Sequence, residues 1–72
     1  MKISAIGYIA DIIGGKEFEK NVKEGVRIRD IIKLPERIEL RIIVLVNDKP
    51  VNLDYKVRDM DNITIMPIVG GG

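Results

Sequence analysis

The sequence predicts a small α+β domain, in which one short helix packs across a mixed sheet of four to five strands. Three observations predict this fold. Short runs rich in Ile and Val alternate with turn residues, one segment alone has clear helical spacing, and 72 residues suffice for a single domain. The chain has no Cys and no His, so its stability has to come from an apolar core, which a hydrophobic content of 46% makes feasible.

The composition also excludes several classes of function. The net charge is +1, with both signs mixed along the chain, which is unlike the basic stripe of a nucleic-acid-binding protein. No apolar run approaches the roughly 20 residues of a membrane span, and residues 1–4 begin a strand pattern rather than a signal peptide. We therefore expect a cytoplasmic protein that binds no nucleic acid directly, no membrane and no cofactor. Thiolate and imidazole chemistry is absent.

The first part of the chain predicts a β-hairpin. Residues 2–10 are rich in Ile and predict a strand, with Ile3, Ala5 and Ile9 on one alternating face. The pair Gly14-Gly15 predicts a turn, since glycine adopts positive φ at little cost. The alternation that follows, through Phe18 and Val22, predicts a second strand. Lys20 falls on its inward face, so we expect an edge strand or a bulge.

A short helix follows the hairpin. Ile28, Ile31 and Ile32 recur with the spacing of one helical face. Arg27 stands where Ser, Thr or Asp is preferred as N-cap, so the helix is expected to begin without a side-chain cap. Pro35 ends it, because the residue before proline avoids the helical region.

The second part of the chain predicts three strands. Residues 38–46 form the strongest of these and carry apolar side chains on both faces, so we expect either ordinary sheet packing or a docking surface on the second face, at Ile43 and Leu45. The later segments are a turn at 47–50, a short strand within 51–57, a turn at 58–62 and a last strand over 63–67. The first and last strands can lie side by side in parallel, because the chain between them is long enough for a crossover. This order predicts the β-grasp arrangement.

The chain is expected to divide into a domain at residues 1–67 and a flexible tail at 68–72, ending in Gly70, Gly71 and Gly72. A glycine-rich end also fits a frayed terminus. However, the glycines follow the last strand directly, and Pro67, which donates no ladder hydrogen bond, stands where the chain leaves the sheet. Extended, residues 67–72 reach roughly 20 Å. Glycine passes a narrow channel without Cβ clashes, so the Gly72 carboxylate is the expected reactive group, and Gly71 gives it access to a partner's active site.

In its motifs the sequence resembles the ubiquitin-like β-grasp sulfur carriers: the molybdopterin synthase small subunit, the thiamine sulfur carrier and the archaeal small modifiers. The similar segments, in chain order, are residues 6–14, 23–32, 46–51, 57–63 and 66–72. Residues 46–51 resemble the Val-Asn-Gly turn of that family, with Asp48 at the glycine. Residues 66–72, Met66-Pro67-Ile68-Val69-Gly70-Gly71-Gly72, match its tail.

The resemblance implies a carrier rather than an enzyme. An E1-like enzyme would use ATP to adenylate Gly72, and the adenylate would become a thiocarboxylate. The sulfur would pass to a molybdopterin or thiamine synthase or to a tRNA-thiolating enzyme. Alternatively, a protein modifier would link Gly72 to lysines of target proteins, and a third reading is a non-covalent binding module whose tail is incidental.

Partner docking is expected around the last strand and the tail. The residues are Arg41, Ile43, Leu45, Met66, Pro67, Ile68, Val69 and Gly70. Arg41 could meet an acidic partner, although a single charge on a strand is usually only solvated. Asp59 and Asp61, in a turn, are expected to bond their own backbone rather than a metal. Residues 14–16 lack the spacing of a phosphate-binding loop.

Overall fold

The computed structural model describes residues 1–68, which form one five-stranded sheet with a small two-stranded ribbon beside it. The order of strands in the large sheet is β2-β1-β7-β4-β5, and the ribbon pairs β3 with β6. The strands are β1 (Lys2–Ala5), β2 (Glu17–Glu19), β3 (Val26–Arg27), β4 (Ile42–Val46), β5 (Lys49–Val51), β6 (Lys56–Val57) and β7 (Asn62–Pro67). The helices are α1 (Tyr8–Ile13), α2 (Ile28–Ile31) and α3 (Glu36–Glu39).

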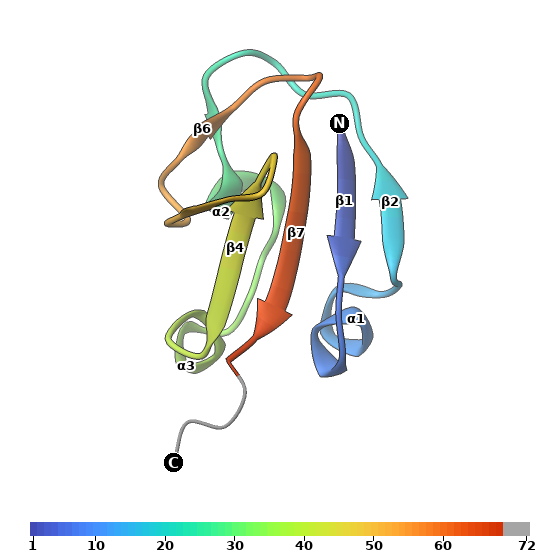
Figure 1. Cartoon of the computed structure of the whole chain (residues 1–72), viewed down its shortest axis with the longest axis vertical. Helices are drawn as coiled ribbons and strands as arrows, with labels where there is room; N and C mark the ends of the chain where they lie inside the picture. The colour runs from blue at the N-terminus through green and yellow to red at the C-terminus, as the bar shows by residue number, and fades with distance from the viewer. Residues whose placement is uncertain (69–72) are drawn as a thin grey trace.

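The centre of the sheet is the parallel pair β1 and β7, which lie side by side in Figure 1. Ile3 is opposite Ile63 and Ala5 is opposite Ile65 in this pair. All other strand pairs are antiparallel. This mixed sheet with short helices is the β-grasp fold, so the predicted fold class is confirmed, and so is the position of β2 at an edge of the sheet.

The core lies on one face of the sheet, against α1 and α2. Strand side chains alternate between the two faces, and on this face the central strands contribute fully buried Ile and Val. From the helices, Ile9 and Ile28 are completely buried. The predicted helix is present as α2, which begins after Arg27 without a side-chain cap, as expected. It ends at Ile31 rather than at Pro35, because Ile32 has an extended backbone. The buried core consists of Ile3, Ala5, Ile9, Ala10, Ile28, Ile32, Val44, Val46, Leu53, Val57, Ile63 and Ile65.

The strand predicted over residues 2–10 is wrong beyond Ala5. Gly7 has φ 63° and ψ −143°, which breaks the extended backbone, and α1 begins at the next residue. Ile9 therefore reaches the core from a helix rather than from a strand. Gly14, at φ 97°, ends the helix, and its N–H donates to the carbonyl of Ala10 at 3.0 Å. A glycine in the left-handed conformation is a common helix end.

The strand predicted over residues 38–46 begins later, at Ile42, and the segment before it is helical. Pro35 has an extended backbone, and its carbonyl accepts the N–H of Ile38 at 2.9 Å, which closes the first turn of α3. Proline suits the start of a helix because its missing N–H would be unpaired there anyway. Leu40, which lies within the predicted strand, instead follows α3 and is 81% exposed. Residues 1–68 thus contain three short helices where one was expected.

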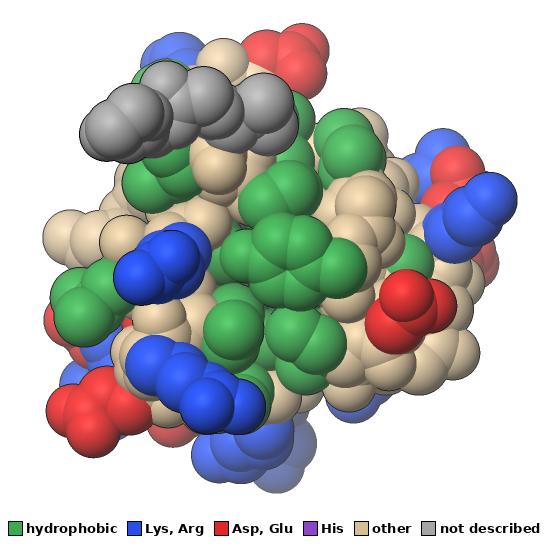
Figure 2. Space-filling model, turned by 90° about the horizontal axis from the view of Figure 1, so that it is seen from below, with side chains coloured by type: hydrophobic (Ala, Val, Ile, Leu, Met, Phe, Trp, Pro, Cys, Tyr) green, Lys and Arg blue, Asp and Glu red, His purple; other side chains and the backbone are tan. Residues whose placement is uncertain are grey.

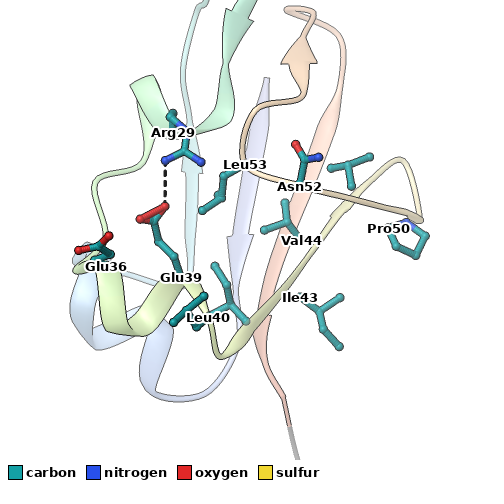
Figure 3. Close-up of a pocket in the computed structure, with 11 residues that line it drawn as sticks. Arg29, Glu36, Glu39, Leu40, Ile43, Val44, Pro50, Asn52 and Leu53 are labelled. Atoms are coloured by element: carbon teal, nitrogen blue, oxygen red, sulfur yellow. Dashed lines mark hydrogen bonds and ion pairs between the residues drawn. The ribbon is translucent and has the colours of Figure 1, made fainter.

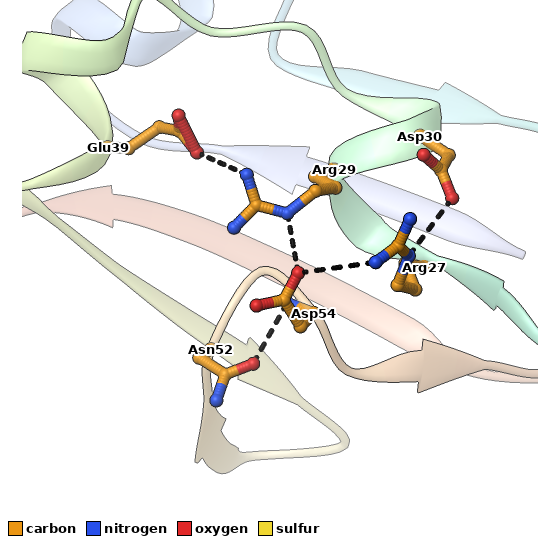
Figure 4. A network of polar contacts seen from close by, with 6 residues as sticks. All are labelled: Arg27, Arg29, Asp30, Glu39, Asn52 and Asp54. Carbon is orange, nitrogen blue, oxygen red and sulfur yellow. Dashed lines mark hydrogen bonds and ion pairs between the residues drawn. The ribbon is translucent and has the colours of Figure 1, made fainter.

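A network of ion pairs connects the elements outside the large sheet (Figure 4). Arg29 on α2 donates through Nε to Asp54 at 2.6 Å and through Nη1 to Glu39 on α3 at 3.1 Å. The hydrogen bond from Arg29 lowers the pKa of Asp54, and the same bond raises the pKa of Arg29. Arg27 adds a longer contact to Asp54 at 3.8 Å. The network joins α2, α3 and the loop after β5.

Asp61 organises the turn before β7. Its Oδ2 accepts the backbone N–H of Arg58 at 2.8 Å, as expected for a carboxylate in a turn. Its Oδ1 accepts from the side chain of Asn47 at 3.0 Å, and Asn47 in turn accepts the backbone N–H of Asn62 at 3.0 Å. Asp61 is buried and its hydrogen-bonding capacity is used within the fold. Asp59 instead accepts the backbone N–H of Val22 at 2.9 Å.

Candidate functional site

The candidate site begins where β7 ends, at the end of the sheet near which α1 and α3 also lie (Figure 1). Pro67 is the last residue of β7 and is opposite Ile42 of β4. The next residue is still attached to the sheet, because the N–H of Ile68 donates to the carbonyl of Arg41 at 2.9 Å. Contact with the sheet therefore extends one residue beyond the boundary predicted at residue 67.

The outer face of the sheet, turned away from the core, lies beside this exit. Val44 and Ile65 point into the core, so the residues next to them on β4 and β7 point outward. These outward residues are partly exposed and mostly apolar. The pairs across the two strands on this face are Ile43 with Met66 and Leu45 with Thr64.

Arg41 and Ile68 extend the outer face by one more pair, because they continue the same alternation. Arg41 is exposed, and its side chain makes no ion pair within residues 1–68. The structure thus brings five predicted docking residues onto one face: Arg41, Ile43, Leu45, Met66 and Ile68. Pro67 lies at the same end of the sheet, but by the alternation along β7 its side chain points to the opposite face. Four further predicted residues, Val69, Gly70, Gly71 and Gly72, lie outside the described residues.

Two apolar residues near this exit were missed by the sequence reasoning. Ile6 follows β1, and its N–H donates to the carbonyl of Ile65 at 2.9 Å, so it continues the sheet on the outer face. It is 49% exposed, and Tyr8 after it is also exposed. The alternation of Lys2, Ser4 and Ile6 was the available signal for this outward position. Figure 2 shows hydrophobic side chains gathered on this end of the molecule, with Lys and Arg side chains along one margin.

A groove of about 580 Å³ opens between α3 and the β4–β5 edge (Figure 3). Leu40 and Ile43 line it together with Pro50 and residues 51–53 of the following chain. Glu36, Glu39 and Arg29 supply its polar groups, and Arg29 is already paired with Glu39. Since Ile43 belongs to both surfaces, the groove is continuous with the outer face.

Within residues 1–68 the structure has no group of three or more His, Cys, Asp or Glu placed to hold a metal ion. The same part of the chain contains no helix that is both long enough and apolar enough to cross a membrane. What the described structure offers is a last strand whose end, at Pro67 and Ile68, lies beside a partly apolar surface.

The ThiS family matches residues 6–72, from the end of β1 to the last glycine of the sequence. The chain belongs to the ThiS family. This family consists of ubiquitin-like sulfur carriers, so the predicted family is confirmed and a sulfur-carrier role follows for this chain. Carriers of the ThiS family work, in general, with E1-like enzymes and synthase partners.

A solved structure supports the fold of this ThiS-family chain. This chain is similar to the solved structure of molybdopterin converting factor, subunit 1, from Pyrococcus furiosus. The TM-score is 0.69, and the identity is 24% over 94% of this chain and 95% of the other. Because the identity is low, this likeness concerns the β-grasp architecture alone.

Proposed function

We propose that this protein carries sulfur as a thiocarboxylate on Gly72. The Gly72 carboxylate attacks the α-phosphorus of ATP in an E1-like enzyme, which forms an acyl-adenylate and releases pyrophosphate. A sulfide-level donor then attacks the carbonyl carbon and displaces AMP, which leaves with one of the carboxylate oxygens. The chain supplies the reacting carboxylate, and the partner supplies the catalytic groups and ATP.

The observation that carries this proposal is the family match through the glycine end, on a chain whose last strand is central to the sheet. A carboxylate is a poor electrophile, so it requires activation, and glycine leaves the backbone narrow enough to enter the activating site. Gly71 serves this access. The rigid attachment at Ile68 supports the presentation of the segment beyond it.

The outer face is the proposed docking surface for the activating enzyme. Its apolar residues lie beside the end of β7, and contiguous exposed apolar surface is typical of protein contacts. Arg41 stands at its margin and would pair with a carboxylate of the partner. The same face would meet the acceptor enzyme, a molybdopterin or thiamine synthase or a tRNA-thiolating enzyme, because both partners have to receive the same tail.

The proposal is tested by co-expressing the chain with its cognate activating enzyme and a sulfur source, followed by intact-mass spectrometry. We expect one terminal oxygen to be exchanged for one sulfur, and a chain that lacks Gly71 and Gly72 to stay unchanged. An unchanged mass with an enzyme that is active on ATP would refute the carrier. Glycine remnants on lysines of other proteins in a cell-wide digest would instead assign the modifier function.

A further inference from the structure

The end of β7 is held by backbone contacts on both sides. On the β4 side, Pro67 is opposite Ile42, and Ile68 donates to the carbonyl of Arg41 at 2.9 Å. On the β1 side, the N–H of Ile6 donates to Ile65 at 2.9 Å. The last strand is therefore fixed in the sheet up to the residue that precedes the four not described.

Gly7 lies close to Pro67 and has a backbone conformation that favours glycine. Its φ of 63° and ψ of −143° lie in a region that is essentially restricted to glycine. A Cβ built on Gly7 would lie 3.4 Å from Cγ of Pro67 and 3.7 Å from its Cδ. These are ordinary van der Waals distances, so Gly7 lies beside the proline ring where β7 ends, and its φ rather than a lack of space favours glycine.

The conformation of Gly7 also sets the position of α1. Its carbonyl accepts the N–H of Ala10 at 3.1 Å, which closes the first turn of the helix. Any other L-residue at position 7 would be strained at this φ and would relax by moving the backbone. Such a movement would displace the surface on which the ring of Pro67 rests.

We propose that Gly7 is a positioning residue for the C-terminal tail. It sets the direction in which the chain leaves the sheet by holding Pro67, while the carbonyl of Arg41 holds Ile68. This inference rests on the proposed function of the tail. It implies that the segment entering a partner begins at Val69. Four residues extend at most about 14 Å, which is shorter than the roughly 20 Å expected if the tail began at Pro67. The activating centre must then lie within that distance of the Arg41–Ile68 pair when the two proteins dock.

The test compares Gly7→Ala with Gly25→Ala. Gly25 is a matched control because it also has a positive φ, 86°, but nothing lies near an added Cβ, and it precedes β3, away from the end of β7. The first readout is amide hydrogen exchange at Ile68 by NMR, which does not depend on activation. We expect exchange at Ile68 to be at least about tenfold faster in Gly7→Ala and unchanged in Gly25→Ala.

The second readout is pyrophosphate release with the cognate activating enzyme and ATP. In Gly7→Ala, docking through the outer face is retained, so KM should stay within about twofold of the wild-type value. The kcat should fall about tenfold or more, because the Gly72 carboxylate is misplaced. Equal losses of kcat in both glycine variants would overturn the proposal, as would unchanged exchange at Ile68 in a folded Gly7→Ala protein.

A second variant covers the case in which Gly7→Ala does not fold. Pro67→Ala removes the ring and imposes no strain on Gly7, and it should give the same faster exchange at Ile68 and the same fall in kcat. Normal values of both would refute the positioning role. If the wild-type chain is not activated at all, the proposed function fails, while the exchange measurements still decide whether Gly7 and Pro67 hold the strand end.

Discussion

Nε of Arg29 lies 2.6 Å from Oδ1 of Asp54, and this contact joins α2 to the loop after β5. The hydrogen bond from Arg29 lowers the pKa of Asp54. A carboxyl group with a lowered folded-state pKa stabilises the fold above its unfolded value, about 3.9, and this contribution is lost as the pH falls through the folded-state pKa. The raised pKa of Arg29 has no effect on this range, because its contribution is present at all lower pH values.

We therefore predict that Asp54→Asn lowers the melting temperature at about pH 7. The difference from wild type should begin to shrink as the pH falls below about 4 and should disappear once the pH has fallen through the lowered folded-state pKa of Asp54. Since both groups are solvent-exposed, the effect should be small and weaker at high salt. Calorimetry over a pH series measures it. Glu24→Gln is the control, because Glu24 makes no ion pair within residues 1–68. A difference that persists unchanged at low pH would contradict the assignment.

Replacement of Asp61 by Ala should destabilise the fold much more. It leaves the N–H of Arg58 and the amide of Asn47 without their acceptor near the start of β7. The two hydrogen bonds are part-buried, so the loss should approach the cost of an unsatisfied buried donor, about 1–3 kcal/mol, a large share of the roughly 5 kcal/mol expected for a small domain. Urea denaturation measures the loss. Asp61→Asn keeps one acceptor oxygen and should lose less, and equal losses would argue against a role for both bonds.

Asp48→Gly should stabilise the hairpin of β4 and β5. Asn47 and Asp48 both have positive φ, 50° and 69°, as the favoured two-residue hairpin turn requires, and Asn-Gly is the preferred pair there. Removing the strain at Asp48 should add about 0.5–1 kcal/mol to the free energy of unfolding. The control is Lys49→Gly, which places glycine in β5 and should destabilise it. A loss of stability in Asp48→Gly would refute the turn geometry.

Ile43→Asp should weaken docking without unfolding the domain. Ile43 is 38% exposed on the outer face, beside Met66, so a charge there is tolerated in the free protein but is desolvated in an apolar contact. We expect KM for the activating enzyme to rise about tenfold or more, with the melting temperature nearly unchanged. Met60→Asp, at an apolar site in the turn before β7 that is 82% exposed, is the control. Equal effects of both changes would exclude the outer face.

Much of the fold follows from local patterns that agree with one another. The helical spacing of Ile28, Ile31 and Ile32 predicted α2, and the strand alternation after Asn62 predicted β7. In each segment only one of the two periodicities, helical or extended, places the apolar side chains on the core side. The parallel pairing of β1 with β7 followed from the order of elements and the length of the connection. These features are determined by hydrophobic pattern and chain length.

The two misassigned segments have a different cause. Ile9 and Ala10 are buried, and burial of so short an apolar run is compatible with the two-residue period of a strand and with the roughly 3.6-residue period of a helix. The run therefore did not distinguish strand from helix. The decisive features were single residues: Gly7, whose backbone turns the chain, and Pro35, which begins α3. The contact of Gly7 with Pro67 joins distant parts of the chain, and no local pattern predicts it.

Because β1 pairs in parallel with β7, the strand that leads to the proposed reactive residue, Gly72, takes its place only when the domain has folded completely. Lys2 and Asn62 are partners although about sixty residues separate them, so the centre of the sheet closes only after most of the chain has been synthesised. A chain truncated before β7 loses the strand between β1 and β4 together with the glycines. If the activating enzyme docks on the outer face, as proposed above, it therefore encounters that face only on molecules that have completed folding.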